Sequence, residues 1–335
     1  MNYSWFFRNC IQKPVVFVMT LLLLTCCTDT IGLSVPDNSI HFSNDIGIPS
    51  SRTNMNGSNA SFTANDQIGV FETLTNRDNV LYTYDTPNWT TTTPMYWRNN
   101  ISLHKFYAYY PYNSSSTGQA VVVPALSGQT ISSSPDARYD LLTASLNTTH
   151  TASVNFNFNH ALTLLKFNVS FATSLLSTLA SSKITITGGN STTSTYPSGL
   201  FNTTASLSNL SYNLINQQLV IANNTSSTFQ QSFTATLPTL VSGATTIYVL
   251  VLPGTYTNPA PYVKFSVKLI SLIELSTSSP SLNTTTFQPN TVYEYNVQVI
   301  PKLLSRANSP ADSIEVFITS VKEFSGTHTI QYCIT

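Results

Sequence analysis

Apolar and polar residues alternate in many short stretches of this chain, and a period of two predicts β-strands. The pattern is clearest at 154–158 (VNFNF) and 164–171 (LLKFNVSF), where apolar side chains alternate with mostly polar ones. Such strands bury one face and leave the other in water. We therefore expect a core that contains Phe156, Phe158, Leu165, Phe167, Ile247, Val249, Val251, Phe265, Val267, Val297 and Val299.

Further strands are predicted wherever short β-favouring runs are bounded by Gly, Pro, Asn and Ser clusters. Only 172–180 (ATSLLSTLA) has the character of a short helix. Many strands separated by turns predict an all-β fold made of β-sandwiches. The additional strands are expected at 68–71, 80–84, 106–110, 120–123, 183–187, 218–222, 246–252, 262–270, 292–300 and 313–319.

The N-terminus has the pattern of an export signal. Arg8 and Lys13 precede an apolar run at 14–24, which is too short to cross a bilayer as a helix and has the size of a signal-peptide core. The run ends in Leu-Thr-Cys-Cys, which resembles a bacterial lipoprotein box, so we predict a signal peptide at 1–26 and lipidation of Cys27. Cys26 is the alternative acceptor, and an ordinary secretory peptide with incidental cysteines is the other interpretation.

The remaining chain is long enough for two domains. The sequence NTTHTAS interrupts the strand pattern near 147–153, which predicts an N-terminal β-sandwich domain at 27–150 and a C-terminal one at 151–335. The same stretch could equally be a hairpin loop. With Cys10 and Cys26 removed and Cys27 lipidated, only Cys333 remains, so we expect no internal disulfide.

Charge is scarce, at 8% of residues, and its distribution argues against an enzyme. Neither Asp nor Glu occurs between Asp140 and Glu274, and the five histidines lack metal-ligand spacing. His160 is expected to have a turn or core role. Without a basic footprint the chain is not expected to bind nucleic acid. We predict neither a cofactor nor a metal.

Several segments of the chain occur in an order and spacing that is fairly specific. They are SIHF (39–42), NDQIGVF (65–71), HKFYAYYPY (104–112), YDLLTAS (139–145), FNFNHALTLLKFNV (156–169), GLFN (199–202), VLPGTY (251–256) and NTVYEYNVQV (290–299). Together they resemble the fimbrillin family of Bacteroidales, the Mfa-like or type V pilin lipoproteins, over about residues 39–300. The resemblance implies two transthyretin-like β-sandwich domains, exported as lipoproteins and assembled into adhesive fimbriae outside the outer membrane. The implied partners are neighbouring pilin subunits, fimbrial accessory subunits and the outer membrane through the lipid.

The resemblance also implies how such subunits polymerise. A surface protease cuts after an arginine in an early loop, frees the first strand, and lets a strand of the next subunit add to the open sheet edge. Arg52 fits this position, because it lies in a polar loop and is the only Lys or Arg between Lys13 and Arg77. The alternative is a solvated arginine without a processing role. Ile40 and Phe42 alternate as a removable strand would, or as an edge strand that stays in place.

The C-terminal residues depart from the family pattern. Residues 313–319 or 328–334 could donate the strand, or either could complete the second domain. This departure leaves room for a tip or anchor subunit that does not polymerise. A surface glycan-binding lipoprotein with exposed aromatics is the rival class, although alternation places the cluster of Tyr107, Tyr109, Tyr110 and Tyr112 in a core rather than on a sugar-binding surface.

Overall fold

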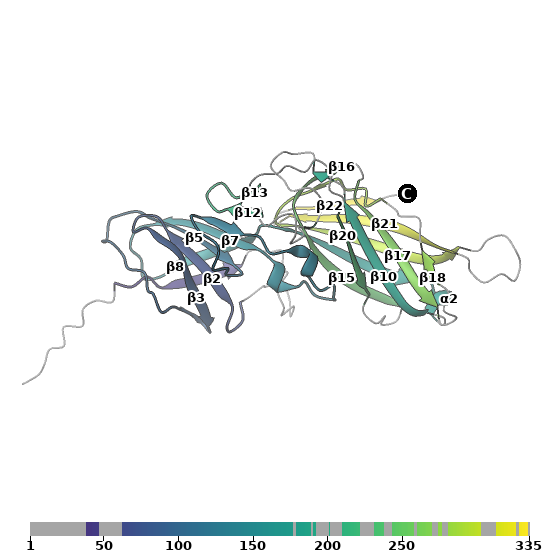
Figure 1. Cartoon of the computed structure of the whole chain (residues 1–335), viewed down its shortest axis with the longest axis horizontal. Coiled ribbons are helices and arrows are strands. Elements are labelled where there is room, and N and C mark those ends of the chain that lie inside the picture. Colours follow the sequence, from purple (N-terminus) through teal and green to yellow (C-terminus); the bar gives the residue numbers. More distant parts are fainter. Residues whose placement is uncertain are drawn as a thin grey trace, which may run out of the picture. The chain divides into compact units, whose positions relative to one another are not determined.

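The computed structural model describes residues 38–46, 62–176, 179–188, 190–191, 201, 210–221, 231–237, 243–257, 260–269, 274–276, 281–302, 313–325 and 328–333 (Figure 1). Within these ranges the fold is all-β, as the alternation predicts. The short helical elements are α2 (Thr173–Leu176), η1 (Leu126–Gly128) and η2 (Ala137–Tyr139). No helix in the described ranges is both long and apolar enough to cross a membrane.

The first sheet has seven strands, in the order β1-β8-β7-β5-β2-β3-β4. All neighbours pair antiparallel except β1 and β8, which run parallel. In β8 the buried residues alternate with exposed asparagines, so one face of the strand packs into a core. The strands are β1 (Phe42–Ile46), β2 (Gln67–Glu72), β3 (Arg77–Asp85), β4 (Asn88–Thr90), β5 (His104–Tyr110), β7 (Leu142–Thr148) and β8 (Val154–His160).

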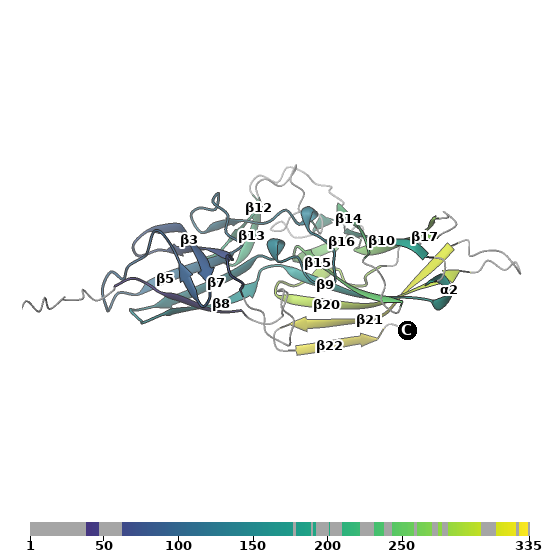
Figure 2. The same cartoon turned by 90° about the horizontal axis from the view of Figure 1, so that it is seen from below.

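The second large sheet has five strands, in the order β15-β9-β20-β21-β22. Its central strand β20 pairs parallel with β9 and antiparallel with β21 (Figure 2). The strands are β9 (Thr163–Phe171), β15 (Ala244–Val251), β20 (Thr291–Lys302), β21 (Ser313–Ser325) and β22 (His328–Cys333).

Three smaller sheets complete the described fold, in the orders β14-β10-β17-β18, β11-β16-β19 and β13-β12-β6. Their strands are β6 (Ala120–Val122), β10 (Leu179–Gly188), β11 (Asn190–Ser191), β12 (Leu210–Asn213), β13 (Gln218–Ile221), β14 (Gln231–Thr236), β16 (Gly254–Thr257), β17 (Tyr262–Leu269), β18 (Glu274–Ser276) and β19 (Thr286–Phe287).

The predicted core is confirmed. All eleven apolar side chains that the alternation assigned to the interior are at most 2% exposed. Tyr107, Tyr109 and Tyr110 are buried as well, and Tyr112 packs against the core, so this aromatic cluster is a packing feature. A short helix occurs within the stretch where one was expected, 172–180, at Thr173–Leu176, whereas Leu179 already begins β10.

The chain passes from the seven-stranded to the five-stranded sheet between His160 and Thr163. β8 follows the predicted boundary at residue 150 but pairs with β1 and β7. Residues 39–335 form one compact unit by their contacts. The division into domains at 27–150 and 151–335 therefore stays a prediction, as does the signal peptide at 1–26, which lies outside the described residues.

Candidate functional site

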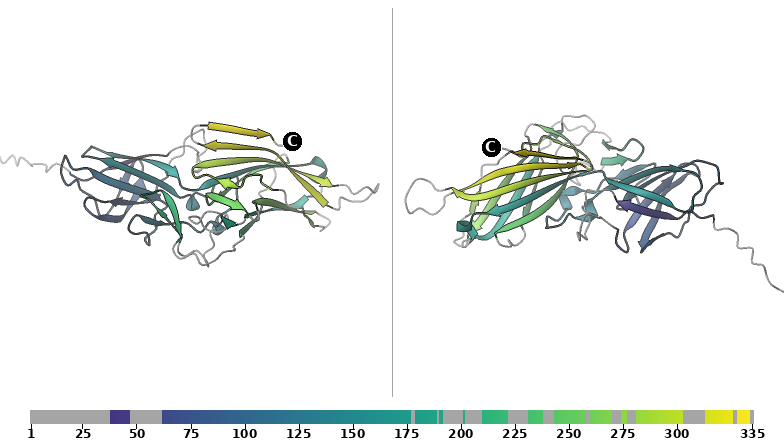
Figure 3. Two further views of the ribbon diagram at one scale, coloured as in Figure 1. Left: turned by 90° about the horizontal axis from the view of Figure 1, so that it is seen from above. Right: turned by 180° about the vertical axis from the view of Figure 1, so that it is seen from behind.

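The first strand closes a seam between the two ends of the seven-stranded sheet. On one side, β1 pairs in parallel with β8, from Phe42 opposite Val154 to Ile46 opposite Phe158. On the other side, the residues just before β1 meet the segment that follows β4, the opposite end of the sheet. There Ser39 forms a bridge with Tyr96, and the backbone N–H of Ile40 donates to the Met95 carbonyl at 2.8 Å. Figure 3 shows β1 in purple within this sheet.

We call the surface that holds residues 39–46 the strand seat; it is made by β8, Tyr82, Trp89, Met95–Tyr96 and Phe106. β8 depends on β1 for most of its pairing, because among the described residues it otherwise pairs only through Asn159 and His160 with β7. Without β1, the outer edge of Val154–Phe158 has unpaired backbone groups.

Two side chains of the first segment fill the apolar part of the strand seat. Ile40 is 4% exposed and Phe42 is 5% exposed. The Phe42 ring stacks on Phe156 at 5.1 Å between centroids and meets Tyr82 edge-on at 4.9 Å. Burying side chains of this size contributes about 1.5–3 kcal/mol each. The alternation of Ile40 and Phe42, noted in the sequence, therefore reflects one buried face shared by the start of β1 and the residues just before it.

Polar contacts fix the register of the strand. The Trp89 indole N–H donates to the Asn44 side-chain oxygen at 2.7 Å. The Val154 N–H donates to the His41 carbonyl at 2.8 Å, and the Ser153 hydroxyl donates to the Ser43 hydroxyl at 3.1 Å. Any strand bound in this register therefore needs a hydrogen-bond acceptor two residues after its buried aromatic side chain, where it can accept from the Trp89 N–H.

Tyr82 is a buried titratable group of the strand seat. Burial raises the pKa of Tyr82 to about 12, against the smaller opposing effects of the Met95 backbone and Arg77. Because the Phe42 ring covers Tyr82, the ionisation of this phenol reports whether the strand seat is filled.

The predicted processing and lipidation residues lie outside the described residues. Arg52 falls on the connection between Ile46, where β1 ends, and Phe62, where the described chain resumes. Phe62 is buried and packs edge-on against Trp89 at 5.1 Å and Phe158 at 5.3 Å. The described chain thus leaves and rejoins the same core on either side of Arg52. Cys27 and its alternative Cys26 also lie outside the described ranges.

Both candidate donor segments complete the five-stranded sheet of their own chain. Residues 313–319 begin β21, which pairs with β20 from Ser313 to Ser325. Residues 328–333 form β22, an edge strand that pairs with Ser320–Ser325 of β21. Ile314 of β21 is 3% exposed, so this strand contributes to the core. Sequence reasoning missed Tyr82, Trp89 and Met95, because no local pattern shows that they surround residues 39–46.

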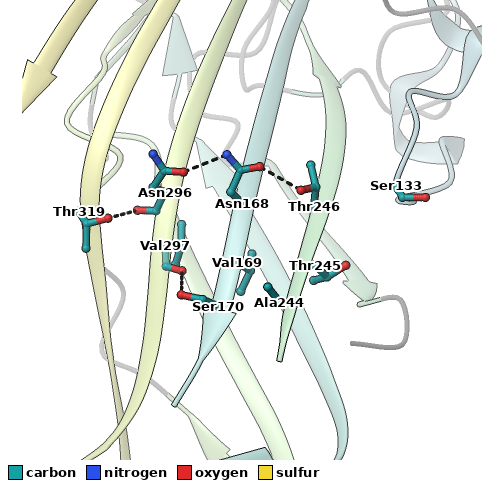
Figure 4. A pocket seen from close by; sticks show the side chains of 10 residues that line it. All are labelled: Ser133, Asn168, Val169, Ser170, Ala244, Thr245, Thr246, Asn296, Val297 and Thr319. Carbon is teal, nitrogen blue, oxygen red and sulfur yellow. Dashed lines mark hydrogen bonds between the residues drawn. The ribbon is translucent and has the colours of Figure 1, made fainter. Parts of the chain in front are cut away.

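A hollow of about 550 Å³ lies on the polar side of the five-stranded sheet (Figure 4). Asn168 accepts from the Thr246 hydroxyl at 3.0 Å and donates to Glu294 and Asn296 at 2.9 Å each. Asn296 donates to the Ser320 hydroxyl at 2.5 Å. These groups satisfy one another across β15, β9, β20 and β21. We call Thr246, Asn168, Asn296 and Ser320 the polar row; their side-chain hydrogen bonds hold the four strands in register.

Two histidine–carboxylate pairs are buried and structural. His104 Nδ1 lies 3.1 Å from Glu72, and the Glu72 carboxylate also accepts from the N–H groups of Leu74 and Thr75 at 2.7 Å each. His160 Nδ1 lies 3.0 Å from Asp140, which agrees with a core role for His160. No cluster of three potential metal ligands occurs in the part of the chain that the structure describes.

Comparison with known proteins identifies the family. A model of the Fimbrillin-like family matches residues 52–319. Among solved structures, a candidate cell adhesion protein from Bacteroides uniformis is 18% identical with a TM-score of 0.57, over 87% of this chain and 100% of that one. Another, from Bacteroides ovatus, is 15% identical with a TM-score of 0.52, over 84% of this chain and 96% of that one. These two likenesses show a shared fold. No curated protein matches.

The family match covers most of the chain and agrees with the all-β fold. Fimbrillin-like proteins are structural rather than catalytic. This chain therefore belongs to the fimbrillin-like family, and is a non-enzymatic fimbrial protein of the cell surface.

Proposed function

We propose that this protein is a structural subunit of cell-surface fimbriae, exported to the outer membrane as a lipoprotein on Cys27 and polymerised by strand exchange after proteolysis at Arg52. The observation that carries the proposal is the position of β1. It closes the seam of its sheet and supplies the pairing of Val154–Phe158, yet a single connection, which contains Arg52, joins it to the rest of the sheet.

Cleavage after Arg52 makes the first strand a separate peptide. Two buried side chains, Ile40 and Phe42, contribute about 3–6 kcal/mol of apolar burial. Once the strand is a separate peptide, its binding also costs translational and rotational entropy. That cost is as large as the free energy gained from burying Ile40 and Phe42, or larger, so the cleaved strand can dissociate. The released fragment carries Cys27, so the subunit leaves its lipid anchor in the same step.

The vacated strand seat is a strong acceptor of another strand. It presents the free edge of Val154–Phe158, the Met95 carbonyl and an apolar pocket lined by Tyr82, Phe106 and Phe156. An open edge beside an apolar pocket favours β-strand addition, in which the backbone supplies affinity and alternate side chains supply specificity.

β22 is the better donor of the two C-terminal candidates. It is an edge strand with one described neighbour, whereas β21 lies between β20 and β22 and contributes Ile314 to the core. Ile330 and Tyr332 also repeat the spacing of Ile40 and Phe42, with an aliphatic residue two positions before an aromatic one.

The decisive experiment treats purified, lipidated precursor with an arginine-specific protease and follows oligomers on denaturing gels. Wild-type protein should give a ladder, and Arg52→Ala should stay monomeric and folded. Arg52→Lys is the matched control, since it should resist the arginine-specific protease yet polymerise after a lysine-specific one. Normal fibre assembly by Arg52→Ala would exclude this activation site.

Donor identity is tested in the same assay. Tyr332→Ala should stop polymerisation without preventing cleavage, whereas Gln331→Ala, on the alternate face, should polymerise normally. Complete cleavage with no oligomers from the wild type would favour an anchor or tip subunit whose C-terminal strands stay in their own sheet.

Lipidation is tested by mass spectrometry of the membrane-bound protein. A mature N-terminus at acylated Cys27 is expected. Cys27→Ser should accumulate precursor, while Cys26→Ser should be processed normally. A mature N-terminus at any residue other than cysteine would refute the lipoprotein assignment.

A further inference from the structure

The strand seat contacts the first segment at three alternate positions. Ile40 and Phe42 are buried, and Asn44 is half-buried. Ile40 and Phe42 fill apolar space, whereas the Asn44 side-chain oxygen accepts from the Trp89 indole N–H at 2.7 Å. Side chains at every second residue of an extended segment lie on one face. The strand seat therefore reads an aliphatic, an aromatic and a hydrogen-bonding side chain in that order.

Trp89 supplies the contact that discriminates between partner strands. Its side chain is 7% exposed and lies against Phe62 at 5.1 Å and Tyr84 at 5.0 Å, measured between ring centroids. These neighbouring rings hold the indole in place, so its N–H cannot easily turn to another acceptor. A buried N–H left without an acceptor costs more free energy than a typical hydrogen bond contributes. A strand that places an apolar side chain opposite Trp89 is therefore disfavoured.

The length of the acceptor side chain narrows the choice further. The oxygen of Asn44 is attached to Cγ, and Asp carries its oxygens on the same atom. The hydroxyl oxygen of Ser or Thr is attached to Cβ, one bond nearer the backbone. Because the bond from Trp89 to Asn44 spans 2.7 Å, an oxygen drawn back by one bond lies beyond hydrogen-bond distance. Asn and Asp thus fit this position in the register of β1, and Ser and Thr do not.

Neither C-terminal strand of this chain carries the full pattern. Tyr332 has Ile330 two positions before it and Ile334 two positions after it, so β22 matches the first two positions and misses the third. The other two aromatic residues after residue 302 have a charged residue at the aliphatic position and neither Asn nor Asp at the third. Their flanking pairs are Glu315 with Thr319 around Phe317, and Lys322 with Gly326 around Phe324.

We infer that the strand seat selects its partner through Trp89, and that the partner it fits best is a strand of a different subunit with an aliphatic residue, an aromatic residue and Asn or Asp at alternate positions. This inference rests on the proposed strand exchange. β22 of a second copy leaves the Trp89 N–H without an acceptor and is the weaker occupant. The first segment carries the full pattern in Ile40, Phe42 and Asn44, so it keeps the seat closed to other copies before cleavage.

Synthetic peptides titrated against full-length protein cleaved at Arg52 test this selection. One pair covers 328–335 with Cys333→Ser, with and without Ile334→Asn. A second pair covers 38–45, with the native sequence or with Asn44→Leu, which nearly keeps the side-chain shape. In each pair the peptide with Asn should bind about fivefold to tenfold more tightly, because it alone satisfies the Trp89 N–H.

Two controls locate the origin of this preference. On protein with Trp89→Phe, both advantages should vanish, because phenylalanine has no N–H to donate. Gln331→Asn in the 328–335 peptide is the matched control on the ligand side. It introduces the same amide at the position that corresponds to the exposed His41, so the affinity should stay unchanged.

The outcomes separate this selection from strand exchange itself. If no peptide binds, including native 38–45, strand exchange at the strand seat is wrong and the selection falls with it. If the peptides bind but Asn gives no advantage, or the advantage persists on Trp89→Phe, strand exchange stands and selection by Trp89 is wrong. If Trp89→Phe does not fold, the 38–45 peptide with Asn44→Thr decides: it should bind as weakly as Asn44→Leu, and native affinity would overturn the selection.

Discussion

β1 and β20 each pair in parallel with a neighbour, β1 with β8 and β20 with β9. β20 has twelve residues and lies between β9 and β21, with pairs along most of its length on both sides. β1 has five residues at the end of its sheet, and its other side is met only by the Ser39–Tyr96 bridge and nearby contacts among the described residues.

The difference shows how one chain combines a permanent and a replaceable parallel strand. Parallel strands normally occur inside sheets, because their pairing is slightly weaker and their faces are usually covered. β20 follows this rule and is further fixed by the polar row through Asn168 and Asn296. β1 is a parallel strand at the end of its sheet, which is unusual. The first segment is held in place mainly by the burial of Ile40 and Phe42 in the strand seat. A replacement strand needs to reproduce only those few contacts.

The largest loss of stability is expected for a core substitution in the five-stranded sheet that contains β20. Phe167→Ala removes a fully buried ring that stacks on Tyr295 at 5.1 Å. The free energy of unfolding should fall by about 3–5 kcal/mol, measured by denaturant titration. Ile101→Ala, at an exposed position, should change it by less than about 0.5 kcal/mol. A loss below about 1 kcal/mol for Phe167→Ala would show that the centre of this sheet is not rigid.

Phe42→Ala should also be costly, at about 3 kcal/mol, but its effect should be local. Hydrogen-exchange protection should fall along β1 and Val154–Phe158, while protection of β9 and β20 stays unchanged. His41→Ala, at the exposed position between Ile40 and Phe42, is the control. Equal loss of protection in both sheets would contradict a separately releasable first strand.

Alkaline pH should loosen the strand seat. The neutral phenol of Tyr82 is favoured in the folded state, because burial raises its pKa to about 12. Its contribution to stability is therefore complete below the ordinary pKa of about 10 and is lost as pH rises toward 12; a shift of two units corresponds to about 2.7 kcal/mol. Subtracting the ultraviolet titration curve of Tyr82→Phe from that of the wild type isolates the ionisation of the Tyr82 phenol. Removing the first strand should bring its pKa toward 10, and an unchanged pKa would show that β1 does not cover Tyr82.

Trp89→Phe should have a smaller effect on β1. The indole N–H that bonds to Asn44 is lost while an aromatic ring remains, so the local opening of β1 should become easier by about 1 kcal/mol. A double-mutant cycle with Asn44→Ala, read by hydrogen exchange of β1, measures the coupling. Strictly additive single effects would mean that this bond does not hold the strand.

The smallest effect concerns the ion pair beside the polar row. Lys166 Nζ lies 3.0 Å from Glu294, and both side chains are partly exposed. A double-mutant cycle with Lys166→Met and Glu294→Gln should give a coupling of about 0.2–1 kcal/mol that falls with added salt. A coupling above about 2 kcal/mol would mean that charge pairing, rather than packing and strand pairing, fixes β20.

Much of the fold was predictable because burial in a β-strand follows local alternation. Phe156, Phe158, Leu165 and Phe167 lie at every second position and are all buried. The helix expected within 172–180 forms at Thr173–Leu176, but Leu179 pairs with Leu269 of β17, and this long-range pairing overrides a weak local preference for helix. The alternation of Ile40 and Phe42 correctly indicated one buried face, although β1 begins only at Phe42. Their partners could not be predicted, because Tyr82 lies in β3 and Met95 follows β4, both far away in the sequence.

The sequence by itself determined which side chains face a core, the all-β class and the likeness to fimbrillins, since these depend on neighbouring residues and on the order of short segments. Only the tertiary structure decided that β1 is an edge strand parallel to β8, that β22 is the outer strand of another sheet, and that Ser39, just before β1, bridges Tyr96 at the far end of the first sheet. The physical reason is that a period of two specifies the face a residue occupies and leaves open which strand lies beside it.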